Sequence, residues 1–202
     1  MVADVAARGV AEDQLRDRLA ARAGAAGVGS SDVSAQISSF PFLGRLLVSG
    51  TISEVDVSLL DVTVRGVTFA SVGVELRAVR IDRYSLVQDR RLALESIGRG
   101  TAVAEISGDE VSRLLGVTIL FEDGQAQVRV GGELVTVAAR LEGPSLVVEA
   151  GGITLPPIEI PPLPLVSDCL SRTEIVAGRL RLTCVLDEVP VELAGRSVNI
   201  PL

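Results

Sequence analysis

A stretch of alternating apolar and polar residues decides the fold: residues 51–81 read TISEVDVSLLDVTVRGVTFASVGVELRAVRI. Alternation with a period of two is typical of strands that bury one face. The phase of this alternation changes along the stretch. Apolar residues have odd numbers in 55–59 and 67–69, but even numbers in 60–64 and 72–78. The turn at Arg65-Gly66 explains one shift, and β-bulges, which bend and twist a strand, would explain the others. We therefore predict two long strands in a strongly curved antiparallel sheet.

The segment before these strands has the features of a helix followed by a strand. Residues 3–23 are rich in alanine and place Asp4 four residues before Arg8, a spacing that supports a helix. Glycines at 24–29 then favour a break. We predict a helix over 3–23 and a strand over 33–38.

The second half of the chain predicts one short helix and a series of hairpins. Ser107 is a suitable N-cap for a helix over 108–115, after a strand over 102–106. Glycine-containing turns then separate a series of short apolar segments. We predict strands at 117–122, 125–130, 133–141, 145–150, 174–176 and 179–185, and one more within 189–200.

Residues 155–164 contain more than half of the prolines of the chain. Proline at this density gives an extended segment with few ladder hydrogen bonds. Because the segment also contains Ile158, Ile160 and Leu163, we predict that it covers the sheet as a strap rather than hanging free. The length of 202 residues is that of one domain, which we place over 1–202.

A second distinctive stretch lies just before the long strands, where residues 37–50 read ISSFPFLGRLLVSG. It holds two of the four Phe residues in a chain that has five aromatic residues in all. Pro41 restricts Phe40 to extended conformations, so we predict a loop that enters a helix over 42–48. Two interpretations stay open: the loop closes the end of the core, or it forms the mouth of an apolar cavity.

The basic residues exclude several kinds of catalytic site. All 19 are Arg, and the chain has no Lys and no His. Catalytic triads and zinc sites that depend on His, and nucleophiles that depend on Lys, are therefore excluded. Chemistry based on two carboxylates remains possible, but the spacing predicts no such pair. We expect no enzyme activity and no cofactor.

The net charge of −7 argues against a nucleic acid as partner. A locally basic stretch alternates with acids, which favours a solvated surface; the alternative is a rim that meets anionic headgroups. Its basic residues are Arg80, Arg83, Arg90, Arg91 and Arg99.

Cys169 and Cys184 flank a predicted hairpin at 176–180. The hairpin would bring the two backbones within range of a disulfide, and such a bond would imply an exported protein. The alternative is two buried thiols.

These segments together resemble the LmeA-like family of phospholipid-binding proteins from the actinobacterial cell envelope. The matching features are the N-terminal helix, SFPFL at 39–43, the strand and helix over 104–115, LPL at 163–165 before Cys169, and the hairpin residues 178–180. The resemblance covers nearly the whole chain and includes no catalytic motif.

The resemblance implies an α+β fold of the tubular lipid-binding type. In this fold a strongly curved antiparallel sheet wraps around an N-terminal helix and a short second helix. It also implies binding of a phospholipid, a phosphoinositide or a lipid-linked glycan in an apolar cavity, in support of lipid or lipoglycan biogenesis such as that of lipomannan. We expect export to the periplasmic space, with a signal or anchor upstream of this chain, and possible contact with the membrane surface.

The candidate lipid-binding residues are the apolar residues around the Phe-Pro-Phe segment, one arginine beside them and a few apolar residues further along. They are Phe40, Pro41, Phe42, Leu43, Arg45, Leu46, Leu47, Phe69, Leu114, Leu115 and Phe121. Core packing is the alternative role for each apolar residue. The competing function is a structural or adaptor protein of the envelope, with a filled core and a docking loop at this segment.

Overall fold

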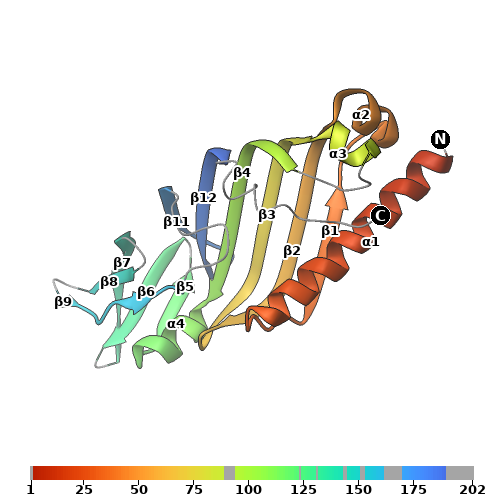
Figure 1. Ribbon diagram of the computed structural model, residues 1–202. Helices are drawn as coiled ribbons and strands as arrows, with labels where there is room; N and C mark the ends of the chain where they lie inside the picture. The colour runs from red at the N-terminus through yellow and green to blue at the C-terminus, as the bar shows by residue number, and fades with distance from the viewer. Residues whose placement is uncertain are drawn as a thin grey trace.

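The computed structural model describes residues 2–88, 94–122, 124–130, 132–142, 145–150, 153–161 and 170–189. These residues form four helices and two antiparallel sheets (Figure 1). The predicted α+β class is therefore confirmed.

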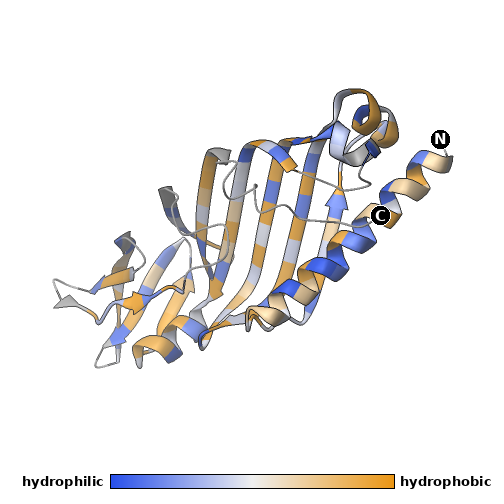
Figure 2. Ribbon diagram, in the orientation of Figure 1, coloured by the Kyte–Doolittle hydropathy of each residue, from blue (hydrophilic) through white to orange (hydrophobic). Residues whose placement is uncertain are grey.

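The first sheet has the strand order β1-β2-β3-β4-β12-β11. Its strands are β1 (Asp32–Ile37), β2 (Thr51–Val64), β3 (Val67–Ile81), β4 (Leu94–Ser107), β11 (Leu170–Val176) and β12 (Arg179–Val189). Figure 2 shows apolar and polar residues alternating along its long strands. The predicted strand over 102–106 is thus the end of a longer strand, β4, and the strands predicted near 174–176 and 179–185 are also longer than expected. The final strand predicted within 189–200 lies almost entirely outside the described residues.

The second sheet has the order β10-β8-β7-β6-β5, with β9 also paired to β8. Its strands are β5 (Ile119–Glu122), β6 (Gln125–Val130), β7 (Glu133–Glu142), β8 (Ser145–Ala150), β9 (Ile153–Thr154) and β10 (Ile158–Glu159). The two-residue strands β9 and β10 agree with the prediction of few ladder hydrogen bonds in the proline-rich segment. Ile158 is buried there, while residues 162–164 of the segment lie outside the described residues.

The helices are α1 (Val2–Ala25), α2 (Phe42–Ser49), α3 (Arg83–Gln88) and α4 (Gly108–Leu115). The three predicted helices are confirmed, and α3 was not predicted. Ser107 caps α4, because its Oγ accepts a hydrogen bond from the Glu110 N–H at 3.2 Å. Glu110 in turn accepts from the Thr68 N–H at 2.7 Å, which ties α4 to β3.

The phase shifts in β2 and β3 have a different origin from the predicted bulges. The two strands keep one register from Thr51 opposite Arg80 to Val64 opposite Val67, so neither strand gains a residue. Instead, Asp61 in β2 and Ala78 in β3 have positive φ angles of 50° and 53°. The register shift that does occur lies between β3 and β4. The pairing of β2 with β3 therefore contains none of the predicted bulges, and the one register shift within 51–81 lies at Arg80 and Ile81, where β3 pairs with β4.

Helix α1 lies along the edge strand β1 (Figure 1). Ala7, Ala11 and Leu15 pack against a core cluster on one face of the first sheet. The Glu12 carboxylate accepts a hydrogen bond from the Ile37 N–H at 2.8 Å. The helix thus covers the edge of the sheet, whereas the expectation was that the sheet wraps around it.

The apolar side chains form two core clusters. The inter-sheet cluster contains residues of both sheets and α4, among them Phe69, Ile106 and Leu180. The α2 cluster contains Phe42 and Leu46 with residues from the other end of β2, β3 and β4. Because the long strands run through both clusters, one sheet connects the two ends of the molecule.

Candidate functional site

The predicted lipid-binding residues are divided among both clusters and the surface. Phe42 and Leu46 belong to the α2 cluster, whereas Phe69 and Phe121 belong to the inter-sheet cluster. All four are buried, and Phe69 is 0% exposed. These residues are thus packed in the core, and no described contact joins the two groups into one site.

The remaining predicted residues are more accessible to solvent. Phe40 and Leu47 are 63% and 57% exposed. Pro41 and Arg45 are also exposed. Three leucines are half-buried: Leu43 packs against the α2 cluster, and Leu114 and Leu115 pack against the inter-sheet cluster.

The position of α2 depends on a carboxylate from another helix. Asp4 of α1 accepts hydrogen bonds from the N–H groups of Phe42 at 3.0 Å and Leu43 at 2.7 Å. Pro41, at the N-cap position, makes no side-chain cap, so Asp4 satisfies these donors instead. The helix ends at Gly50, which has a φ of 65°. The Phe-Pro-Phe segment is therefore held at a defined place beside α1.

An apolar band crosses the first sheet between the two clusters. Cross-strand partners share a face, and the register places Val57 opposite Val74 and Leu59 opposite Val72. Val57, Leu59, Val74 and Leu76 are all half-buried. We call these four residues the apolar band. They leave apolar surface accessible in the middle of a face whose two ends are packed.

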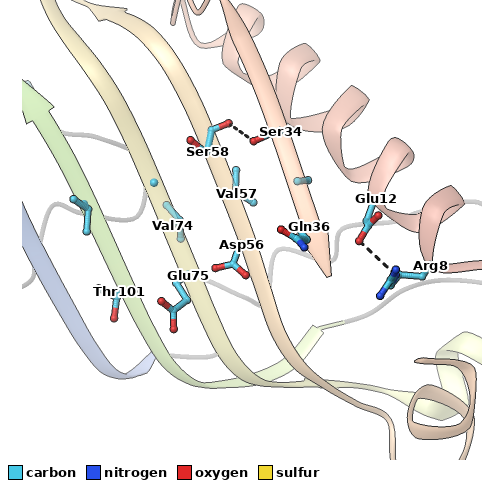
Figure 3. A pocket seen from close by; sticks show the side chains of 13 residues that line it. Arg8, Glu12, Ser34, Gln36, Asp56, Val57, Ser58, Val74, Glu75 and Thr101 are labelled. Carbon is cyan, nitrogen blue, oxygen red and sulfur yellow. Dashed lines mark hydrogen bonds and ion pairs between the residues drawn. The ribbon is translucent and has the colours of Figure 1, made fainter. Parts of the chain in front are cut away.

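The opposite face of the same sheet carries a polar groove of about 600 Å³ (Figure 3). Two neighbouring rows of cross-strand partners form its floor, and α1 forms one wall. The first row is Gln36, Asp56, Glu75 and Thr101, the second is Ser34, Ser58, Gly73 and Val103, and the wall is Arg8 with Glu12. Ala35, Val57 and Val74, which lie between these rows on the same strands, also line the groove, although strand alternation directs their side chains to the face of the apolar band.

The charged groups of the groove differ in how well neighbouring groups compensate their charge. Burial raises the pKa of Asp56, and repulsion from Glu54 and Glu75 raises it further, against the opposing effect of Arg77. Arg8 Nε lies 3.8 Å from a Glu12 oxygen and has no hydrogen-bond acceptor. Hydroxyl, amide and carboxyl groups in this arrangement suit a polar ligand, whereas the apolar band on the other face suits a hydrocarbon.

The described residues provide no other obvious chemistry. Among them, no group of three or more His, Cys, Asp or Glu side chains is placed to hold a metal ion. None of the helices within the described ranges has the length and hydropathy needed to cross a bilayer. Cys184 is buried in β12, but Cys169 lies outside the described residues, so the predicted disulfide is not tested.

Sequence reasoning missed both the band and the groove. The groove is built from short pieces of α1 and of β1 to β4, and the band from the middle of β2 and β3. The alternation did show which residues share a face within one strand. The missing information was the register, which decides which residues of neighbouring strands lie side by side.

Comparison with known proteins adds a family to this geometry. A family model described as LmeA-like phospholipid-binding matches residues 2–200. No curated protein and no solved structure matches the chain significantly. Since the match spans almost the entire chain, the protein belongs to the LmeA-like phospholipid-binding family.

Proposed function

We propose that the protein binds a phospholipid or a lipid-linked glycan whose acyl chains lie on the apolar band. The observation that carries this proposal is the half-buried state of Val57, Leu59, Val74 and Leu76 between two packed clusters. The membership of the phospholipid-binding family supports it.

Apolar surface left in contact with water is unfavourable, at roughly 25 cal/mol per Å². An acyl chain along the band would cover this surface without displacing core residues. Lipid sites of this kind need an apolar lining and few polar groups. Val57 and Leu76 also pack against the α2 cluster, so a chain on the band would continue an existing apolar surface.

The same substitution on opposite faces of the sheet tests this assignment. Val74→Phe fills part of the band, whereas Val103→Phe adds the same side chain to the floor of the polar groove. Each purified protein is extracted with organic solvent, and its lipids are quantified by mass spectrometry. We expect a phospholipid or glycolipid from the wild type and from Val103→Phe, and a strongly reduced amount from Val74→Phe.

Two results would contradict the proposal. The first is that the wild type carries no lipid after expression in a lipid-containing host and takes none from vesicles, which would show that the protein does not bind lipid. Loss of lipid from Val103→Phe alone would place the ligand in the groove instead of on the band. Fragmentation of the recovered lipid identifies its headgroup, and so separates a phosphoinositide from a lipid-linked glycan.

The proposed role is non-catalytic: holding or presenting lipid during envelope lipid or lipoglycan biogenesis, including that of lipomannan. The family description, which names binding and no reaction, supports this role. We also propose that the protein is exported to the periplasmic space and carries a disulfide between Cys169 and Cys184. The intact mass of protein from an oxidising compartment, measured with and without reductant, tests the bond. Fractionation of the native host tests the location.

A structural adaptor of the envelope is the second candidate. The exposure of Phe40 and Leu47 favours it, because such residues suit a docking surface. The two functions differ in the lipid experiment: an adaptor yields no bound lipid, and its partner binding is insensitive to Val74→Phe.

A further inference from the structure

One end of the molecule exposes a group of large apolar side chains. Phe40, Leu47, Val48 and Tyr84 are 63%, 57%, 75% and 66% exposed. They lie on α3, on α2 and just before it, and the two helices pack together at the end of the first sheet (Figure 1). We call these four residues the apolar tip.

The sequence of α2 explains why this end differs from an ordinary protein surface. A surface helix has an apolar face toward the core and a polar face toward water. The α2 residues FLGRLLVS bury Phe42 and Leu46 but turn Leu47 and Val48 outward. The helix is therefore apolar on both sides, as expected where the second side meets a partner or lipid.

Three arginines lie on the elements at this end: Arg45 on α2, where it donates to the Ser53 hydroxyl, Arg80 near the end of β3 and Arg83 on α3. Arg45, Arg80 and Arg83 are exposed, and an Arg83 guanidinium N–H donates to the Val48 carbonyl, which joins α3 to α2. Two acids also lie at this end and accept local hydrogen bonds, which hold them in place but do not remove their negative charge; the hydrogen bonds from Ser85 and Tyr84 lower the pKa of Asp82. Asp4 accepts from the start of α2, and Asp82 accepts from the Tyr84 N–H at 2.9 Å and the Ser85 hydroxyl at 2.7 Å.

We propose that the apolar tip docks the protein on the surface of a phospholipid bilayer. Phe40, Leu47 and Val48 enter the boundary between headgroups and acyl chains, and Tyr84 lies at the headgroup level, where amphipathic aromatic rings are favoured. The arginines extend toward lipid phosphates. A bilayer fits this surface better than a protein partner does. It can take up exposed apolar side chains and bind cations at the same time, and it needs no surface of complementary shape.

The tip is also continuous with the proposed lipid site. Phe42 and Leu46 lie beneath it in the α2 cluster, and that cluster contacts Val57 and Leu76 of the apolar band. Docking at this end would place the band close to the membrane from which a lipid is taken. This consequence rests on the proposed function, whereas the docking itself does not.

The composition of the chain provides a native probe of docking. The protein has one Tyr and no Trp, so its intrinsic fluorescence reports on Tyr84 alone. Wild-type protein is mixed with vesicles of phosphatidylcholine and phosphatidylglycerol that carry a spin-labelled lipid at the depth of the headgroup boundary. We expect quenching of Tyr84, whereas no quenching and no flotation with these vesicles would overturn the proposal.

Two matched pairs of variants test the contributing side chains. Leu47→Ser/Val48→Ser is compared with Leu60→Ser/Leu134→Ser, which alters exposed apolar residues away from the tip. We expect the tip variant to lose vesicle affinity at least about tenfold per residue, and the control to lose little. Arg45→Gln/Arg80→Gln should weaken binding about fivefold per residue, mainly to anionic vesicles at low salt, relative to exposed Arg129→Gln/Arg172→Gln.

The remaining outcomes separate docking from lipid storage and from protein binding. Vesicle affinity of Val74→Phe equal to that of the wild type supports docking even if no bound lipid is found. Equal vesicle affinity of both serine variants would overturn the proposal. The proposal would also be overturned if the wild type formed a dimer that does not bind vesicles and the tip variant were monomeric, because the tip would then be a protein interface.

Discussion

At the residue scale, single residues fix the two ends of α2, the helix that begins within the Phe-Pro-Phe segment. Asp4 supplies the acceptors that Pro41 cannot supply at the start of α2, and Gly50 provides the left-handed residue at its end. Neither role depends on the large apolar residues between them. The two ends of α2 are therefore fixed by a carboxylate and a glycine, while Phe42 and Leu46 anchor the helix in the α2 cluster.

We expect Asp4→Ala to destabilise the protein by about 1–2 kcal/mol, because two backbone N–H groups lose a charged acceptor. The free energy of unfolding from urea titrations measures this effect. Asp17→Ala, an exposed acid on the same helix, is the control and should change stability little. Equal effects of the two substitutions would show that the cap is not important.

Two helix C-caps offer a comparison of glycine substitutions. Gly50 and Gly116 both have positive φ, 65° and 70°. A Cβ at position 116 meets nothing within 4 Å, whereas one at position 50 would lie 2.6 Å from the Ile81 carbonyl oxygen. We expect Gly116→Ala to cost about 1–2 kcal/mol and Gly50→Ala clearly more, because a clash adds to the strain. Thermal unfolding of both variants checks the order, and a reversed order would contradict the close contact.

At the element scale, one carboxylate joins three strands on the polar face. Glu105 of β4 accepts from Arg181 of β12 at 2.9 Å, from Arg179 at 3.1 Å and from Ser71 of β3 at 3.3 Å. Burial by itself raises the pKa of Glu105, but the hydrogen bonds from Arg181 and Arg179 outweigh burial and hold the pKa below its usual value. The ion pairs thus support the strand order β3-β4-β12.

The sign of this shift predicts a pH dependence. A depressed pKa in the folded state contributes stability above the usual Glu pKa of about 4.3, and the contribution is lost as pH falls through the lower folded value. We expect Glu105→Gln to lower stability at neutral pH by roughly 1–3 kcal/mol, with the difference from wild type shrinking below about pH 4. Urea titrations over a pH series measure it. Glu133→Gln, at an exposed position, is the control, and a pH-independent difference for Glu105→Gln would rule out this linkage.

At the scale of the whole molecule, two core clusters share β2, β3 and β4. The apolar band lies between them, and the polar groove lies on the reverse side. Because the same strands run through both ends, loss of packing in one cluster should weaken the other. The molecule is then one cooperative unit, as the prediction of a single domain over 1–202 requires.

Leu180→Ala tests this cooperativity. Leu180 is 1% exposed in the inter-sheet cluster, so the truncation should cost about 2–5 kcal/mol. Tyr84 lies at the opposite end and reports on local unfolding there by its fluorescence. We expect the urea midpoints from Tyr84 fluorescence and from far-UV circular dichroism to fall together. A Tyr84 midpoint that stays at the wild-type value would indicate two independent units.

Much of the fold could be predicted because its signals are local. Ser107 and the acids after it marked the start of α4, and Arg65-Gly66 marked the turn between β2 and β3. The phase shifts at Asp61 and Ala78 do not mark bulges between β2 and β3, because these residues adopt positive φ angles while the two strands keep one register, which the pattern of one strand does not reveal. Helix α3 was missed because its six residues are too short to show a periodic pattern.

The sequence by itself determined the α+β class, the extent of α1, α2 and α4, and the absence of Lys and His chemistry, since these follow from composition and from neighbours along the chain. Only the tertiary structure decided that Phe42 is core while Phe40 and Leu47 face outward, and that a polar groove lies behind an apolar band. The physical reason is that burial and strand register depend on contacts between segments far apart in the chain.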